Sequence, residues 1–286
     1  MQSSFWSNTI WYILLAVPSF ISIAFTLYKS SNRNFICGFS MAVLGLTFFA
    51  ETGILTLFNG YRYLPKISSD SFLDAIIGNY FSQFFLTTGV VLIIVYKMPT
   101  IWNFIFAGIN YSIENLFIKL GIYQHFWYKT WFTPIVVLLM LWVVRKWYYH
   151  MLDYPKKYIY YLTLYTGANA LVSFVAVFPI YAFSIQVINV SFGWGFFREQ
   201  AILIVSYRSI LIAIMIILYR MRLKWIWTAL GFAFLFMLQY ILMRIDFLTI
   251  KEGLFSIITF IFLFGAYFSV AIVDYLLGKG SAATQS

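Results

Sequence analysis

Three ionisable side chains stand inside long apolar stretches of this sequence: Glu51, Glu114 and Arg208. A charge inside a bilayer costs about 2.5–3.5 kcal/mol on insertion scales, so such a residue normally has a partner and a role. A carboxylate in that setting can bind a cation or exchange a proton, and a guanidinium can neutralise a carboxylate or hold an anion. These three residues are therefore the first candidates for a binding site.

The three residues share one depth in the predicted membrane spans. Glu51 lies six residues before the end of the second span, Glu114 six before the end of the fourth, and Arg208 seven after the start of the seventh. At 1.5 Å per residue, each lies about 9–10 Å inside its span end. Because even-numbered spans end on the side where odd-numbered spans begin, we expect one polar layer, whichever way the chain inserts.

Neutral polar residues extend this layer. Asn79, Gln83 and Thr87 recur every four residues and share one face of the third span, and Asn110 precedes Glu114 by four residues on the fourth. We predict that these residues line a pocket that opens on the outer side. The predicted ligand-binding or ion-binding residues are Glu51, Asn79, Gln83, Asn110, Glu114, His125 and Arg208.

Within this pocket, we expect Glu114 or Glu51 to pair with Arg208. His125 follows the fourth span at the headgroup level, where a histidine can relay protons or sense pH, or simply anchor the interface. Three interpretations of the layer stay open: hydrogen bonds that only hold helices together, a ligand or ion site, and catalysis.

Catalytic and metal-binding motifs are missing from the sequence. The chain has one cysteine, Cys37, and two histidines, His125 and His150, with no HExxH, G-x-S-x-G, P-loop or dinucleotide fingerprint. We therefore predict no catalytic residue, no metal and no cofactor. The sequence favours a non-enzymatic protein over an enzyme.

The elements that position the polar layer are membrane-spanning helices. The chain is 63% hydrophobic and only 10% charged, and its apolar stretches approach the roughly 20 residues that cross a bilayer. We predict an all-α polytopic bundle of about nine transmembrane helices, or eight if the fifth is re-entrant. It forms one domain, 1–277, followed by a disordered tail, 278–286, and no internal repeat is visible. The predicted spans are Ile10–Tyr28, Phe35–Leu57, Phe72–Tyr96, Ile101–Leu120, Phe126–Val144, Ile159–Tyr181, Ala201–Tyr219, Trp225–Met243 and Leu254–Leu277.

The charge distribution predicts the orientation. With the N-terminus outside, eleven Lys and Arg residues fall on the inner side and seven on the outer side, so we predict an outer N-terminus and a cytoplasmic C-terminus. The net charge of +10 then reflects inner loops that contact anionic headgroups, not nucleic acid. Tyrosines and tryptophans near the span ends are expected to anchor the interface, among them Tyr61, Tyr63, Tyr128 and Trp131.

One segment resembles a known group of proteins. Glu114 leads through His125 to Trp131, and an apolar helix then ends in Arg145-Lys-Trp-Tyr-Tyr. Over residues 72–151 this pattern resembles an uncharacterised family of small multi-pass membrane proteins from spore-forming Firmicutes. The resemblance implies a bacterial plasma membrane and a link to sporulation or the cell envelope, and it points to Glu114 and Trp131 as residues to test.

Taken together, the sequence predicts a multi-pass plasma-membrane protein that binds or transports a small polar solute, an ion or a lipid headgroup through the outer polar layer. One alternative is a non-catalytic membrane assembly or sensor component, with a partner membrane protein. A further alternative is an intramembrane lipid-modifying enzyme with a carboxylate as general base.

Overall fold

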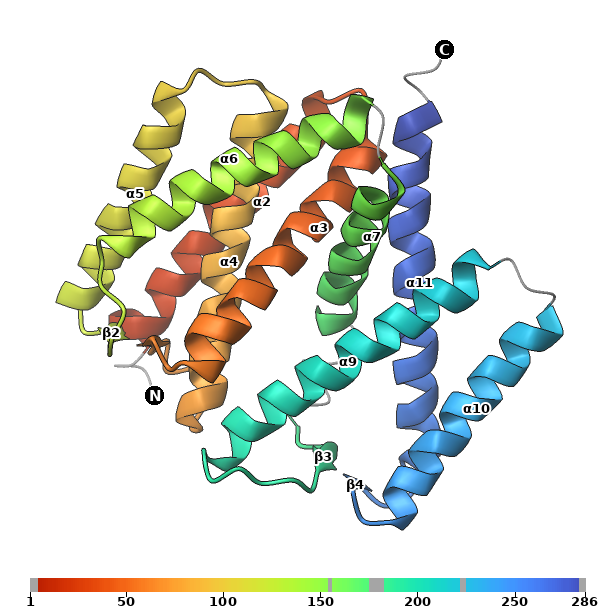
Figure 1. The fold of residues 1–286 in the computed structure, drawn as a ribbon. Helices are drawn as coiled ribbons and strands as arrows, with labels where there is room; N and C mark the ends of the chain where they lie inside the picture. The colour runs from red at the N-terminus through yellow and green to blue at the C-terminus, as the bar shows by residue number, and fades with distance from the viewer. Residues whose placement is uncertain (1–4, 154–155, 175–182, 222–224, 283–286) are drawn as a thin grey trace.

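The chain folds as a bundle of long helices with two small antiparallel sheets (Figure 1). The computed structural model describes residues 5–153, 156–174, 183–221 and 225–282. The α-helices within these ranges are α2 (Ile10–Lys29), α3 (Arg33–Glu51), α4 (Ser71–Val95), α5 (Ile101–Lys119), α6 (Phe132–Asp153), α7 (Lys157–Val172), α9 (Phe196–Arg220), α10 (Trp225–Arg244) and α11 (Phe255–Ala282). Short π-helical turns, η1 (Phe5–Thr9) and η2 (Thr52–Leu57), precede α2 and follow α3.

The described helices confirm an all-α, membrane-embedded protein. Seven of them are long and apolar enough to cross a bilayer. The remaining two are α5, whose sequence includes Asn103, Asn110, Glu114 and Asn115, and α7, whose described part is 16 residues long. The described ranges contain nine α-helices, of which seven qualify as spans by length and composition, so the count of nine spans stays a prediction.

Several predicted boundaries were wrong. The fifth span was expected at Phe126–Val144, but α6 covers Phe132–Asp153 as one continuous helix, because the residues before it form a strand and a turn. The sixth span was expected to reach Tyr181, and residues 175–182 lie outside the described ranges. The last helix continues to Ala282, into the predicted tail, since no proline interrupts it, and 283–286 lie outside the described residues.

Two strand pairs close one end of the bundle. Strand β1 (Tyr61–Tyr63) pairs with β2 (Tyr123–His125), and β3 (Gln186–Ile188) pairs with β4 (Leu248–Ile250), both antiparallel. Figure 1 shows both pairs at the lower end, where the N-terminus also lies. We call this the hairpin end of the molecule.

The chain contains an internal repeat. The order helix, strand, helix, helix, strand, helix occurs twice in the described residues: α3-β1-α4-α5-β2-α6 and α7-β3-α9-α10-β4-α11. Residue numbers of equivalent strand positions differ by 125, as in Tyr61 and Gln186 or His125 and Ile250. Helices α4 and α9 are also displaced by 125 residues at both ends. We call the two halves the first unit and the second unit.

Local hydrogen bonds repeat with the same displacement. The Leu64 amide donates to the Ile122 carbonyl at 3.0 Å, and the Asn189 amide donates to the Phe247 carbonyl at 2.9 Å. A buried carboxylate ties the strand-to-helix loop in both units. Asp74 accepts from the amides of Lys66, Ile67 and Ser68, and its equivalent Glu199 accepts from those of Phe192 and Trp194.

The expectation of no internal repeat was therefore wrong. Buried positions of a membrane helix demand only apolar side chains of suitable volume, so two copies can diverge in identity and keep one fold. Each unit contributes four helices, an even number, so both units insert in the same direction. This agrees with the location of both strand pairs at the hairpin end.

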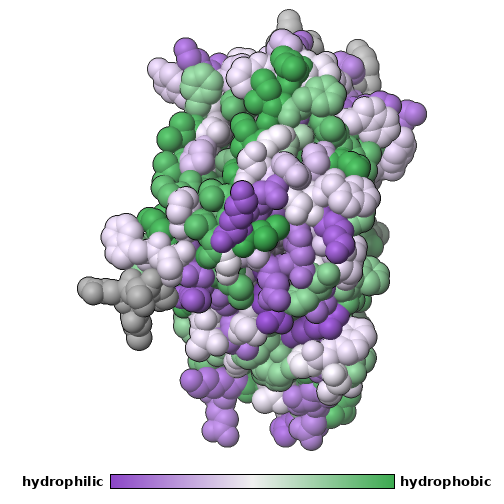
Figure 2. Space-filling model, turned by 90° about the vertical axis from the view of Figure 1, so that its left-hand side faces the viewer, coloured by the Kyte–Doolittle hydropathy of each residue, from purple (hydrophilic) through white to green (hydrophobic). Residues whose placement is uncertain are grey.

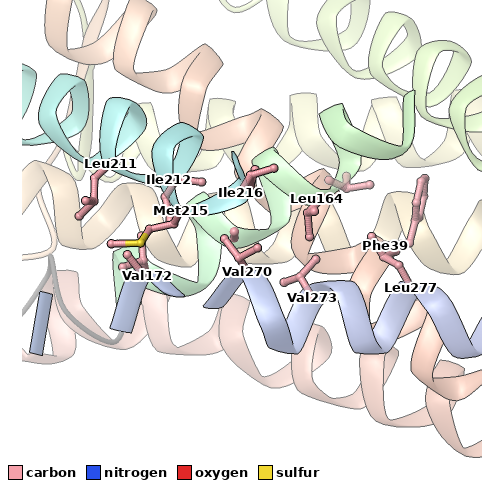
Figure 3. Close-up of a cluster of buried hydrophobic side chains, with 14 of the residues drawn as sticks. Phe39, Leu164, Val172, Leu211, Ile212, Met215, Ile216, Val270, Val273 and Leu277 are labelled. Carbon is pink, nitrogen blue, oxygen red and sulfur yellow. The ribbon is translucent and has the colours of Figure 1, made fainter. Parts of the chain in front are cut away.

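The two units meet closely along α3 and α7, which are equivalent helices. A Cβ atom on Gly45 would lie 1.9 Å from the Thr166 carbonyl oxygen, so only glycine permits this backbone approach. Beside it lies an apolar core drawn from α3, α7, α9 and α11 (Figure 3). Its labelled members include Phe39, Leu164, Met215 and Val273.

Helix α2 packs on α4 of the first unit, and no helix in the described part of the second unit corresponds to it. At the hairpin end, its Tyr12 hydroxyl donates to the Ile122 carbonyl at 2.5 Å, and Asn8 just before it donates to the Leu64 carbonyl at 2.8 Å. The first unit thus has an additional wall that the described part of the second unit lacks.

Candidate functional site

A cavity of about 100 Å³ lies in the first unit, among α2, α3, α4, α5, α6 and the β1–β2 pair. We call it the tyrosine cavity. It contains both glutamates of the predicted layer. Its polar lining residues are Glu51, Tyr61, Tyr63, Ser82, Gln83, Asn110, Glu114, Tyr123, Tyr128 and Thr133.

Glu51 lies at a change of helical geometry. The α-helical pattern of α3 ends at Glu51, and η2 follows with wider hydrogen bonds such as that from the Phe58 amide to the Gly53 carbonyl, 2.9 Å. Such π-helical turns are frequent at functional sites. The Glu51 carboxyl accepts from the Tyr61 hydroxyl at 2.5 Å and from the Gln83 amide at 2.8 Å, so it joins α3, β1 and α4.

Glu114 lies on the α5 side of the same cavity. Its Oε2 accepts from the Thr133 hydroxyl of α6, and its Oε1 lies 2.7 Å from Nε2 of His125 on β2. Burial, with the nearby Lys129 ammonium, lowers the pKa of His125. The imidazole is therefore neutral at pH 7, and a single proton between Nε2 and Oε1 satisfies both atoms.

Four tyrosines form the aromatic wall of the cavity: Tyr61, Tyr63, Tyr123 and Tyr128. Each is at most 7% exposed, so their predicted role as interfacial anchors was wrong for Tyr61, Tyr63 and Tyr128. Burial raises the pKa of Tyr61, Tyr63 and Tyr123 well above the ordinary value, so their hydroxyls stay neutral. The spacing Tyr-x-Tyr and Tyr-x-His, which puts alternate residues on one strand face, is the signal that sequence analysis missed.

Arg208 does not pair with either glutamate, contrary to the prediction. Its Nε donates to Asn169 at 3.1 Å and its Nη1 donates to the Ser173 hydroxyl, both from α7 or its end. No carboxylate of the described residues lies within ion-pair distance of its guanidinium. Arg208 instead lines a separate cavity of about 50 Å³, which also contains Asn79 and Glu51.

The structure therefore divides the predicted layer between two cavities. Gln83, Asn110, Glu114 and Glu51 line the tyrosine cavity, and Asn79 and Arg208 line the smaller one. Glu51 lines both. His125 reaches the first cavity through Glu114.

The second unit provides an internal comparison for this site. Some equivalent positions of the cavity wall are apolar and belong to the main hydrophobic core, and others are polar, such as Gln186 at the position of Tyr61. Tyr63 corresponds to Ile188, Asn110 to Leu235 and Tyr123 to Leu248, and all three apolar residues are buried. Glu114 corresponds to Gln239, whose amide is satisfied by Tyr207 and Thr259, and Gln83 corresponds to Arg208.

This comparison distinguishes the residues that the fold requires in both units from the residues that are specific to the cavity of the first unit. The loop-tying carboxylate is present in both units, as Asp74 and Glu199, so the fold requires it. Glu114, Tyr63 and Tyr123 are replaced by the neutral Gln239 and the apolar Ile188 and Leu248, and the equivalent of Glu51 lies outside the described residues. The fold alone therefore does not require the carboxyl group of Glu114 or these two tyrosines.

Other predicted features have simpler roles. Trp131 is 56% exposed and packs on Phe132 outside the cavity. Within the described ranges, no group of three or more His, Cys, Asp or Glu side chains is arranged to hold a metal ion.

No family model, no curated protein and no solved structure matches this chain.

Proposed function

We propose that this multi-pass membrane protein binds a small cationic group in the tyrosine cavity and transports the solute or headgroup that carries it. The observation that carries the proposal is the pair Glu51 and Glu114, which line one cavity, while the second unit has Gln239 at the position equivalent to Glu114.

The lining favours a cation by charge and by geometry. Two carboxyl groups face the cavity, and neither Lys nor Arg is among the described residues that line it. Tyrosine rings attract a cation through their electron-rich faces, by about 2 kcal/mol or more when the cation is desolvated.

We propose further that the protein resides in a bacterial plasma membrane with the N-terminus outside. The hairpin end is then the outer end, and Glu114 lies five residues, or about 8 Å, from that end of α5. The basic loops at the opposite end contact anionic headgroups. Two units inserted in the same direction are an arrangement that transporters also use.

Binding tests this proposal directly. Tetramethylammonium, methylammonium and sodium ions are added to the purified full-length protein, and the shift in melting temperature is measured. Glu51→Gln and Glu114→Gln should each abolish the shift, while Glu252→Gln, an exposed carboxylate between β4 and α11, should keep it. Cation flux into proteoliposomes should be lost in the same two variants. An unchanged shift in both variants contradicts the proposal.

A second candidate is a non-catalytic assembly component in which the polar layer fixes the helices. The hydrogen bonds of Glu51 to Tyr61 and Gln83 favour it, because they join three elements across the first unit. In that case Glu51→Gln lowers the melting temperature and no cation raises it. Pull-down of a partner membrane protein, weakened by the same variant, would then support the assembly role.

A further inference from the structure

An apolar groove of about 180 Å³ continues from the tyrosine cavity along the first unit. It is lined by α2, α4 and α5, which also line the tyrosine cavity. Phe85 lines both spaces, and its ring lies 6.0 Å from that of Phe106 in the groove, so this ring pair marks the junction.

Helices α2 and α5 both show that the groove extends from the tyrosine cavity away from the hairpin end. On α2, Leu15 lines the cavity and Ser22, two turns further from the hairpin end, lines the groove. On α5, Glu114 lines the cavity and Trp102 lines the far part of the groove. Glu114 and Trp102 are 12 residues apart, about 18 Å along the helix, which exceeds half the thickness of a hydrocarbon core. The two spaces thus lie end to end along the first unit, with Phe85 between them, and are polar at the hairpin end and apolar beyond it.

The groove is open toward the bilayer. Trp102, Ile105 and Ile109 on its α5 edge are 44%, 41% and 44% exposed. Figure 2 shows the side of the molecule that carries α5 in Figure 1, with a group of hydrophilic residues near mid-height and hydrophobic surface above it, away from the hairpin end. A ligand with an apolar chain can therefore enter sideways, with the chain exposed to lipid throughout.

The charges restrict the class of amphiphile. A phospholipid would place its phosphate between the polar head and the apolar chain, near Phe85. Among the described residues that line the cavity and the groove there is no Lys or Arg to pair with such a phosphate. A ligand whose positively charged nitrogen is bonded directly to an apolar chain or ring has no phosphate, so it needs no Lys or Arg partner.

We infer that the ligand is a lipophilic amine: an ammonium group, primary or quaternary, that binds between Glu51 and Glu114 and carries an apolar chain that lies in the groove. This inference rests on the proposed function, which it makes specific. Among the described elements, the second unit has no equivalent of α2, which lines both spaces in the first unit.

The experiment uses tritiated dodecyltrimethylammonium and the full-length protein in phosphatidylcholine nanodiscs, with saturable binding measured by scintillation proximity. Unlabelled dodecyltrimethylammonium, dodecylamine, tetramethylammonium and dodecanol compete. Ser22→Phe fills the groove from α2, and Ala24→Phe, at an exposed position on the same helix, is the matched control. Ile109→Trp fills the groove from α5, should Ser22→Phe fold poorly.

We expect the two dodecyl cations to compete at least tenfold more strongly than tetramethylammonium, and dodecanol to compete weakly. Ser22→Phe or Ile109→Trp should weaken the binding of the dodecyl cations at least tenfold and leave the tetramethylammonium-induced shift in melting temperature unchanged. Ala24→Phe should bind the dodecyl cations and tetramethylammonium as the wild type does, and Glu114→Gln should bind neither kind of cation. A preference between dodecylamine and its trimethyl analogue identifies the headgroup.

Equal competition by tetramethylammonium and dodecyltrimethylammonium, with no effect of the groove variants, overturns the lipophilic-amine inference and leaves a soluble cation as the ligand. Binding that Glu51→Gln and Glu114→Gln do not change overturns the proposed function as well. The two failures are therefore distinguishable.

Discussion

The first and second units have one topology and different interiors. In the first unit, the space among the strand pair and its helices contains two glutamates, a glutamine and four tyrosines. In the second, the equivalent positions supply Ile188, Leu235 and Leu248 to an apolar core, beside the buried polar residues Gln186, Arg208 and Gln239. Burying a carboxyl group is more costly than burying an amide, so Glu114, where the second unit has Gln239, indicates a purpose other than folding.

The contact between the units is where the largest effect is expected. Gly45→Leu would force α3 away from α7, because even a Cβ would lie 1.9 Å from the Thr166 carbonyl oxygen. Overpacking typically costs about 1–3 kcal/mol, and a backbone clash costs more. We expect little monodisperse protein on size-exclusion chromatography. Gly108→Leu on α5, where a Cβ meets nothing within 4 Å, should purify normally, and equal yields would refute close packing between the units.

The loop-tying carboxylates should be equally important in both units. Asp74→Ala and Glu199→Ala each remove the buried carboxylate that accepts from loop backbone amides, and hydrogen bonds to a charged group contribute about 1.5–3 kcal/mol. We expect similar decreases in melting temperature for the two variants, and a near-additive double variant, since the two carboxylates tie separate loops and share no hydrogen-bond partner. Glu252→Ala, at an exposed position between β4 and α11, serves as the control. A large effect in one unit only would contradict the equivalence of the loops.

The cavity residues should separate stability from binding. Asn110→Leu introduces the residue that the second unit has at Leu235, and it should change the free energy of unfolding by less than about 1 kcal/mol. Cation binding should weaken at least tenfold, because the cavity loses volume and a polar group. Chemical denaturation and ligand-induced thermal shift measure the two quantities. Strong destabilisation with intact binding would instead make Asn110 a packing residue.

The smallest effect concerns pH. Because the pKa of folded His125 is lowered, the unfolded state takes up the proton first as the pH falls through about 6.5. Stability should therefore be complete above pH 7 and decline below about 6.5. His125→Gln should flatten this part of the pH profile of the melting temperature, and His150→Gln should not. An unchanged profile in His125→Gln would exclude a neutral buried imidazole.

Much of the fold was predictable because membrane helices are recognised by the length of apolar runs. The sequence predicted the helical class, and it placed α4, α5 and α10 nearly to the residue, whereas α9 begins at Phe196, before the predicted start at Ala201. It failed where aromatic residues have two uses: the segment 123–131 has the composition of an interfacial anchor, yet it forms β2 and a wall of the cavity. Apolar side chains are interchangeable in a core, which is also why the repeat of 125 residues escaped detection.

The sequence by itself predicted one level for Glu51, Glu114 and Arg208, because helical rise converts position along a span into depth. Helix α9 begins at Phe196, so Arg208 lies 12 residues after its start and not seven. Only the tertiary structure decided which of them meet. The rotation of each helix and the pairing of distant strands direct Glu51 and Glu114 into one cavity and Arg208 toward Asn169 and Ser173. The depth of a residue follows from its position along one helix, whereas the side chains that it contacts depend on how several helices pack together.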